Sequence, residues 1–156
     1  MFLQEMRLCY QRGTPKETRI SRAIMTAPIV LFDGLCAFCD ASVQWLIDHD
    51  AAGRLRFASL QSDTGQAILD RFGLPKTGFK SLLLVEGDRY WLRSTGALRI
   101  AGYLDRPWSL APAFLLLPAF LRDPFYDLLA ANRYRWFGRR EACRIPTPEL
   151  RTRFLE

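Results

Sequence analysis

The chain has 156 residues, of which 49% are hydrophobic and 24% are charged, and its formal net charge is +6. This length and apolar content allow one buried core, so we expect a single domain rather than a repeat array or a low-complexity protein. The longest run without a charged residue is 107–121, which contains Pro112 and Pro118 and is shorter than the roughly 20 residues that span a bilayer. We therefore predict no transmembrane span, although peripheral contact with a membrane remains compatible with this sequence.

The first 24 residues differ from the rest, because they are polar, rich in arginine and without hydrophobic periodicity. Met25 stands just ahead of the first apolar run and would serve as a start. We predict that 1–24 is a disordered tail or a misassigned start, that Cys9 has no function, and that 25–156 forms the domain. The tail lacks the apolar core of a secretory signal. Four cysteines that include a Cys-x-x-Cys pair then favour a reducing compartment, the cytoplasm.

The segment 29–40, IVLFDGLCAFCD, combines an apolar strand, an Asp-Gly turn and two cysteines that open a helix. After Cys39 the apolar residues Val43, Leu46 and Ile47 follow at helical spacing, so Cys39 belongs to the buried stripe of a helix over about 36–50. Cys36 falls in the first turn, where backbone N–H groups have no acceptor within the helix. We expect Cys36 to be offered to solvent and Cys39 to lie beneath it.

This arrangement is typical of a dithiol redox site. A helix N-terminus favours negative charge, and the thiolate is the species that attacks a disulfide. We predict that Cys36 attacks and that Cys39, one turn away, resolves the mixed disulfide. Asp33 has two compatible interpretations, a turn residue that accepts local N–H groups and a proton acceptor for Cys39.

The following residues predict alternating strands and helices. A strand is expected at 54–60, and Asp63 with Gln66 fits a capping box for the next helix, which Gly73 and Pro75 end. Strands at 81–85 and 89–93 form a hairpin, and Ser94 or Thr95 caps a helix that reaches about residue 104. The order β-α-β-α-β-β-α resembles the thioredoxin-like fold, with a generic α/β sandwich as the structural alternative.

Residues 106–156 predict a helical extension. The apolar, proline-broken segment 107–121 is expected to form short helices over the sheet. Asp123 and Pro124 supply an N-cap and N1 pair for a last helix that ends near Gly138. The tail 141–156 is expected to wrap around the domain.

Two separated motifs, residues 33–39 (DGLCAFC) and 132–138 (NRYRWFG), make the chain resemble the DCC family of predicted thiol–disulfide oxidoreductases. That family is named for an Asp and two Cys, matched here by Asp33, Cys36 and Cys39. Supporting matches are FASLQ at 57–61, STGAL at 94–98 and Cys143. The resemblance covers about 28–155 and implies a thioredoxin-like fold and thiol–disulfide exchange. Thioredoxins place a cis-proline before the third strand, where it helps to dock the substrate chain. This chain has 78–81 (GFKS) at that position, which favours a small-thiol or specialised substrate.

Three further features have competing interpretations. Cys143 lies among arginines and is a candidate third thiol, or else a small buried residue. A zinc site would need ligands beyond Cys36 and Cys39, and His49 lies too far along the helix, so we predict no metal. The arginines and aromatics of 133–140 suit an acidic partner or glutathione better than nucleic acid, because such segments commonly pack their rings inward.

The sequence therefore predicts a thiol–disulfide oxidoreductase without a bound cofactor. Its partners would be a disulfide-containing protein or a small thiol and an unidentified reductant. The alternative is a non-catalytic binding module in which the Cys-x-x-Cys pair is structural or regulatory.

Overall fold

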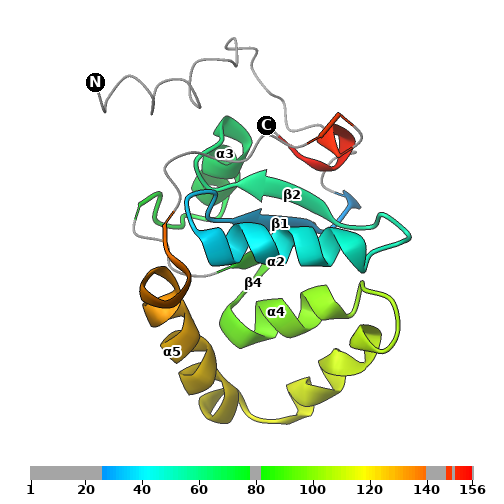
Figure 1. Cartoon of the computed structure of the whole chain (residues 1–156), viewed down its shortest axis with the longest axis vertical. Helices are drawn as coiled ribbons and strands as arrows, with labels where there is room; N and C mark the ends of the chain where they lie inside the picture. The colour runs from blue at the N-terminus through cyan, green and yellow to red at the C-terminus, as the bar shows by residue number, and fades with distance from the viewer. Residues whose placement is uncertain (1–25, 78–81, 140–146, 149, 156) are drawn as a thin grey trace.

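The computed structural model describes residues 26–77, 82–139, 147–148 and 150–155. The predicted tail 1–24 with Cys9, the segment 78–81 and Cys143 lie outside these residues. The elements follow the predicted order β-α-β-α-β-β-α with a helical extension (Figure 1): β1 (Ile29–Phe32), α2 (Ala37–Asp48), β2 (Arg56–Ser59), α3 (Asp63–Arg71), β3 (Leu83–Glu86), β4 (Arg89–Leu92), α4 (Arg93–Ala101), the 3₁₀ helix η2 (Trp108–Leu116), α5 (Ala119–Phe137) and the 3₁₀ helix η3 (Arg151–Arg153).

The four strands form one mixed sheet in the order β2-β1-β3-β4. β1 pairs parallel with β2 and antiparallel with β3, and β3 and β4 form the predicted hairpin. All four residues of β1 are buried, as expected for a strand covered on both faces. This mixed α/β arrangement is consistent with a thioredoxin-like fold.

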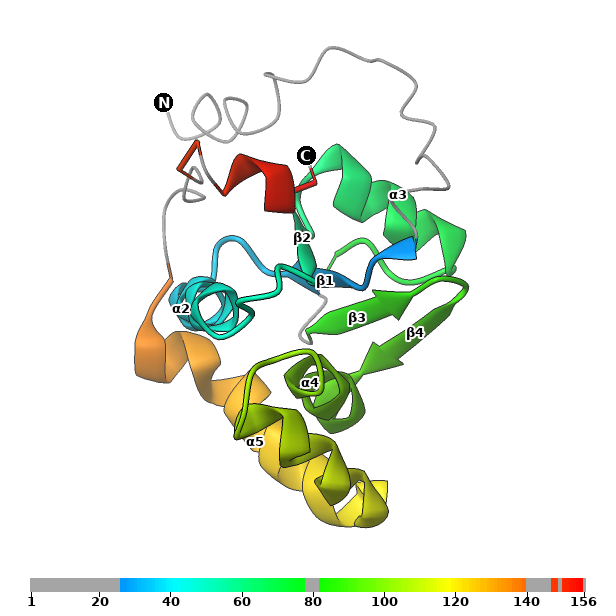
Figure 2. The ribbon, with the colours of Figure 1, turned by 90° about the vertical axis from the view of Figure 1, so that its right-hand side faces the viewer.

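Alternation along the strands divides the core into two halves. Val30 and Phe32 of β1 pack toward α2 and α4, whereas Ile29 and Leu31 pack toward α3. Figure 2 shows α3 on one side of the sheet and α2 and α4 on the other. The cysteines belong to the α2 half, so the site lies over β1, one of the two inner strands.

Two helices begin differently from the prediction. The N-cap of α3 is Ser62, whose hydroxyl accepts the Gly65 N–H at 3.1 Å, so the expected capping box led by Asp63 is wrong by one residue. The N-cap of α4 is Leu92, which makes no side-chain cap. Ser94 bonds Asp123 and Arg122 of α5 instead, because a long-range polar contact replaces the local cap.

The last helix of the extension also begins earlier than predicted. α5 starts at Ala119 after Pro118, and Pro124 lies inside the helix, so the expected Asp123–Pro124 start is wrong. Pro118 has an extended backbone conformation, and the helix begins at the next residue. Asp123 forms a hydrogen bond with Ser94 instead of acting as an N-cap. η2 packs against α4 rather than over the sheet. None of the helices within the described ranges combines the length and apolarity that crossing a membrane requires.

Residues 150–155, a described part of the tail that was predicted to wrap around the domain, return to β2. Phe154 forms a bridge beside Phe57, and the Leu155 N–H donates to the Phe57 carbonyl at 2.8 Å. The adjacent Arg153 forms an ion pair with Asp50, whose side chain is fully buried. Asp50 also accepts the N–H groups of Arg54 and Leu55 at 3.1 and 2.9 Å. One carboxylate therefore joins the α2–β2 loop to the C-terminal segment.

We predict that Asp50→Ala lowers the free energy of unfolding by about 3 kcal/mol, because it leaves a largely buried guanidinium and two backbone donors without their acceptor. Denaturant titration followed by circular dichroism measures this loss. The matched control is Asp70→Ala, which removes an ion pair with Lys76 whose side chains are half exposed and should change stability by only about 0.5 kcal/mol. Equal losses in the two variants would contradict the anchoring role.

Candidate functional site

The two cysteines lie at the N-terminal end of α2, directly after the turn that follows β1. Both are unbridged and buried. Cys39 is 5% exposed within the core, as predicted. Cys36 is 0% exposed and is the N-cap of α2 rather than a residue of its first turn. The expectation that Cys36 is offered to solvent is therefore wrong.

The end of α5 covers Cys36. Arg139 forms an isolated antiparallel bridge with Cys36, and the ring of Phe137 lies 4.8 Å from that of Phe38. A residue 103 positions further along the chain thus occupies the backbone edge of Cys36. Hydrophobic periodicity describes contacts within one helix, and so it does not reveal such a distant cover.

The thiol of Cys39 is strongly held in its protonated form. Burial, together with a hydrogen bond with the Cys36 thiol, raises the pKa of Cys39 from 9.0 to about 12. The positive charge of Arg133 opposes this rise, and its effect is larger than that of the negative charge of Asp33. Cys39 is therefore a protonated thiol in the reduced protein, and Arg133 is the group that favours its thiolate.

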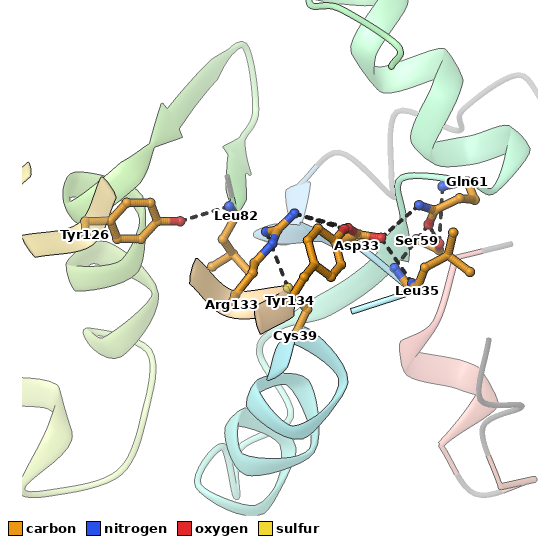
Figure 3. Close-up of polar contacts among 10 residues, drawn as sticks. Asp33, Leu35, Cys39, Ser59, Gln61, Leu82, Tyr126, Arg133 and Tyr134 are labelled. Atoms are coloured by element: carbon orange, nitrogen blue, oxygen red, sulfur yellow. Dashed lines mark hydrogen bonds and ion pairs between the residues drawn. The ribbon is translucent and has the colours of Figure 1, made fainter. Parts of the chain in front are cut away.

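Asp33 organises the polar side of the site (Figure 3). Its Oδ1 atom accepts the Leu35 N–H at 3.1 Å and the Gln61 amide at 3.0 Å. Its Oδ2 atom accepts Arg133 Nη2 at 3.1 Å and the hydroxyl of Tyr134. The predicted role of Asp33 in the turn is confirmed by the bond to Leu35. The carboxylate is also the counter-ion of a buried arginine.

Arg133 and Tyr134 are the functional candidates that the sequence analysis did not single out. Arg133 is 4% exposed, and its Nη1 atom lies 3.7 Å from the Cys39 sulfur while Nη2 pairs with Asp33. Burial, followed by the hydrogen bond to Asp33, raises the pKa of Tyr134. Both residues belong to the 132–138 motif, so this motif indicated the segment that contributes to the site. Its inward-facing arginine was not identifiable among the neighbouring exposed ones.

Gln61 fixes the turn from the other side. Its side-chain oxygen accepts the Gly34 N–H at 3.1 Å and the Ser59 hydroxyl at 2.6 Å, and its amide donates to Asp33. Gln61 is the second residue after the end of β2, which is parallel to β1, so the ends of the two strands bring Asp33 and Gln61 together. The turn that presents Cys36 is therefore held by hydrogen bonds on both sides.

His49, excluded above as a metal ligand, is not part of this cluster. His49 is the C-cap of α2, at the opposite end from the cysteines, and its ring stacks on Trp45 at 4.3 Å. Cys143 and the segment 78–81 lie outside the described residues, so the third thiol and the effect of the missing cis-proline stay predictions.

The chain is similar to known proteins over most of its length. A family model described as DCC1-like thiol-disulfide oxidoreductase matches residues 30–139. The chain is 40% identical over 127 residues to the uncharacterized protein YuxK of Bacillus subtilis, covering 81% of this chain and 93% of the relative. It is also 40% identical over 119 residues to a chloroplastic DCC family protein of Arabidopsis thaliana, covering 76% of this chain and 69% of the relative. No solved structure matches the chain.

We predict that Cys39 in the folded, reduced protein reacts with iodoacetamide at a rate that keeps rising about tenfold per pH unit well above pH 9. The reason is that burial raises the pKa of this thiol to about 12, so the thiolate fraction is still increasing there. Peptide mapping by mass spectrometry at several pH values measures the rate at Cys39. In urea the same rate should level off above about pH 9, which is the internal control. A plateau at the same pH in both states would contradict the prediction.

Proposed function

Because the chain belongs to the DCC1-like thiol-disulfide oxidoreductase family, we propose that it exchanges a Cys36–Cys39 dithiol with the disulfide of a protein or of a small thiol compound. The observation that carries the proposal is the arginine at the dithiol. Arg133 Nη1 lies 3.7 Å from the Cys39 sulfur, and Cys39 is hydrogen-bonded to Cys36. A cation at this position favours the resolving thiolate, a charge that a purely structural thiol pair does not need.

The exchange has two steps. The Cys36 thiolate attacks one sulfur of the substrate disulfide, so that a mixed disulfide forms and the first substrate thiolate leaves. Cys39 then loses its proton, attacks the Cys36 sulfur and releases the second substrate thiol. The substrate gains two electrons and the protein becomes a disulfide, which a thiol reductant must reduce again. The dithiol carries both electrons, so the proposed reaction includes no bound cofactor.

Access to Cys36 requires a local movement. Cys36 is 0% exposed, and Arg139 occupies its backbone edge. A protein disulfide therefore reaches Cys36 after Arg139 has moved away from it. This movement breaks the bridge at Arg139 and leaves the ion pair between Asp33 and Arg133 in place.

Arg133 has a defined task in the second step. Cys39 must become a thiolate in a buried environment, where an uncompensated charge is strongly disfavoured. Arg133 supplies the compensating charge, and Asp33 keeps the guanidinium in position. A proton-shuttle role for Asp33 would require one of its four hydrogen bonds to break, so we assign Asp33 first to positioning.

We place the exchange in a reducing compartment, the cytoplasm, because a dithiol persists there. An organelle is the alternative, since the name of the plant relative assigns that protein to the chloroplast. The second candidate function, a non-catalytic binding module, is favoured by the complete burial of Cys36. The cysteine variants below distinguish the two functions.

We expect Cys36→Ser to abolish turnover with a small disulfide substrate, and Cys39→Ser to accumulate a mixed disulfide at Cys36, because resolution is then blocked. Consumption of substrate and intact-protein mass spectrometry measure the two effects. Cys9→Ser is the matched control and should retain turnover. Cys143→Ser tests the candidate third thiol, since a relay role predicts slower turnover. Absence of turnover in the unmodified protein would favour the binding module, and full turnover by Cys36→Ser would contradict the role of Cys36 as the attacking thiol.

We expect Arg133→Met to slow resolution of the mixed disulfide by about 10- to 100-fold, because the Cys39 thiolate loses its neighbouring cation. Rapid acid quenching followed by mass spectrometry separates this step from the initial attack. Arg133→Lys should restore part of the rate, since it keeps the charge. Arg135→Met is the matched control, because Arg135 lies on the same helix and is exposed. An equal effect on attack and on resolution would contradict the assignment to the second step.

A further inference from the structure

A hollow of about 540 Å³ lies between α2, α4 and α5, beside the dithiol. Its walls are mainly apolar and include Phe38, Trp45, Ile100 and Leu129. Sites of this size commonly bind small molecules. The position between three helices gives the hollow a fixed apolar wall on several sides.

The hollow reaches the two cysteines unequally. Cys39 is one of the residues that line it. Cys36 does not line the hollow, is fully buried, and has its backbone edge occupied by Arg139. A molecule in the hollow therefore meets the sulfur of Cys39 before that of Cys36.

The charge beside Cys39 suits an incoming thiolate. Arg133 also lines the hollow, and its Nη1 atom lies 3.7 Å from the Cys39 sulfur. Ser42 is a further polar group of the wall, and its hydroxyl already donates to the Phe38 carbonyl at 2.8 Å. A thiol with hydroxyl or peptide groups would lose hydration in this hollow with few partners to replace it. The thiolate of an apolar thiol would be attracted to Arg133 in the same way, and it would have no hydroxyl or peptide groups to desolvate.

The hollow continues toward an exposed apolar surface. A second hollow of about 450 Å³ shares Ala97, Tyr126 and Leu129 with the first. Its far wall includes Phe114 and Phe125, which are 61% and 77% exposed. The apolar lining therefore extends from Cys39 to the molecular surface, and it offers room for an apolar chain attached to the reacting thiol.

We propose that this hollow binds a small apolar thiol, and that this thiol reduces the Cys36–Cys39 disulfide by attacking Cys39. The inference rests on the proposed function and names the class of its reductant. The incoming thiolate forms a bond with the Cys39 sulfur, the Cys39–Cys36 bond breaks, and Cys36 leaves as a thiolate at the start of α2. A second thiol then attacks the reductant sulfur of the mixed disulfide. Cys39 leaves beside Arg133 and takes up the proton of that thiol, so two thiols become one disulfide.

The direction of attack follows from which sulfur the hollow reaches. Cys39 lines the hollow, whereas Cys36 is fully buried and has its backbone edge occupied by Arg139. Attack on Cys39 expels Cys36 at the N-terminal end of α2, which favours negative charge. The second step expels Cys39 beside Arg133, whose charge favours its thiolate.

The test compares two dithiols that differ by two hydroxyl groups, 1,4-butanedithiol and dithiothreitol. The oxidised full-length protein is reduced by each, and each rate is divided by that dithiol's rate with bis(2-hydroxyethyl) disulfide in solution. We expect the normalised rate of 1,4-butanedithiol to be at least about tenfold higher, because its apolar chain enters the hollow without desolvating hydroxyl groups. A ratio near one would overturn this inference alone. No reduction by either dithiol would overturn the proposed function as well.

Substitutions in the wall of the hollow test whether the difference between the two dithiols arises there. Ala101→Leu and Ala130→Leu each narrow the hollow and should bring the ratio close to one. Ala52→Leu, in an exposed turn, is the matched control and should keep the ratio of the unmodified protein. Trapping with 1-butanethiol at low pH provides a test that needs no wall variant. We expect the adduct on Cys39, and an adduct confined to Cys36 would overturn the inference.

Discussion

The ion pair between Asp33 and Arg133 is the contact on which the site depends. Its two side chains are 7% and 4% exposed and come from positions 100 residues apart. A buried charge without a partner is strongly disfavoured, so each residue makes the other's position necessary. The pair joins the turn after β1 to α5 and holds a cation beside Cys39. The helical extension is therefore part of the dithiol site and not an addition to a complete domain.

The same pair sets a balance of charge at Cys39. Arg133 favours the thiolate, Asp33 disfavours it, and burial exceeds both, so the pKa of Cys39 stays high. The Cys39 thiol is consequently held in its protonated form, and in the proposed exchange it would become more reactive once Cys36 is part of a mixed disulfide. Loss of the Cys36 thiol removes one of the influences that raise this pKa. The site couples the reactivity of the second sulfur to the state of the first.

Local patterns in the sequence predicted the local parts of this structure. The spacing of Cys39 and Val43 correctly predicted a buried stripe, and the strand and helix order was correct because each element has its own periodicity. The errors arise where distant residues compete with local signals. Ser94 bonds α5 instead of capping its own helix, and Cys36 is covered by Arg139. No periodicity distinguishes the buried Arg133 from the exposed Arg135, because both stand in a motif of alternating cations and rings.

The two sulfurs consequently have different surroundings, although they are one helical turn apart. Arg139, just beyond α5, occupies the backbone edge of Cys36. Cys39 borders a hollow whose walls come from α2, α4 and α5. A dithiol that accepts electrons at one sulfur and delivers them at the other can keep its two reaction partners apart. The extension that buries the site therefore also provides its asymmetry, since α5 carries both the wall of the hollow and, beyond its end, the cover of Cys36.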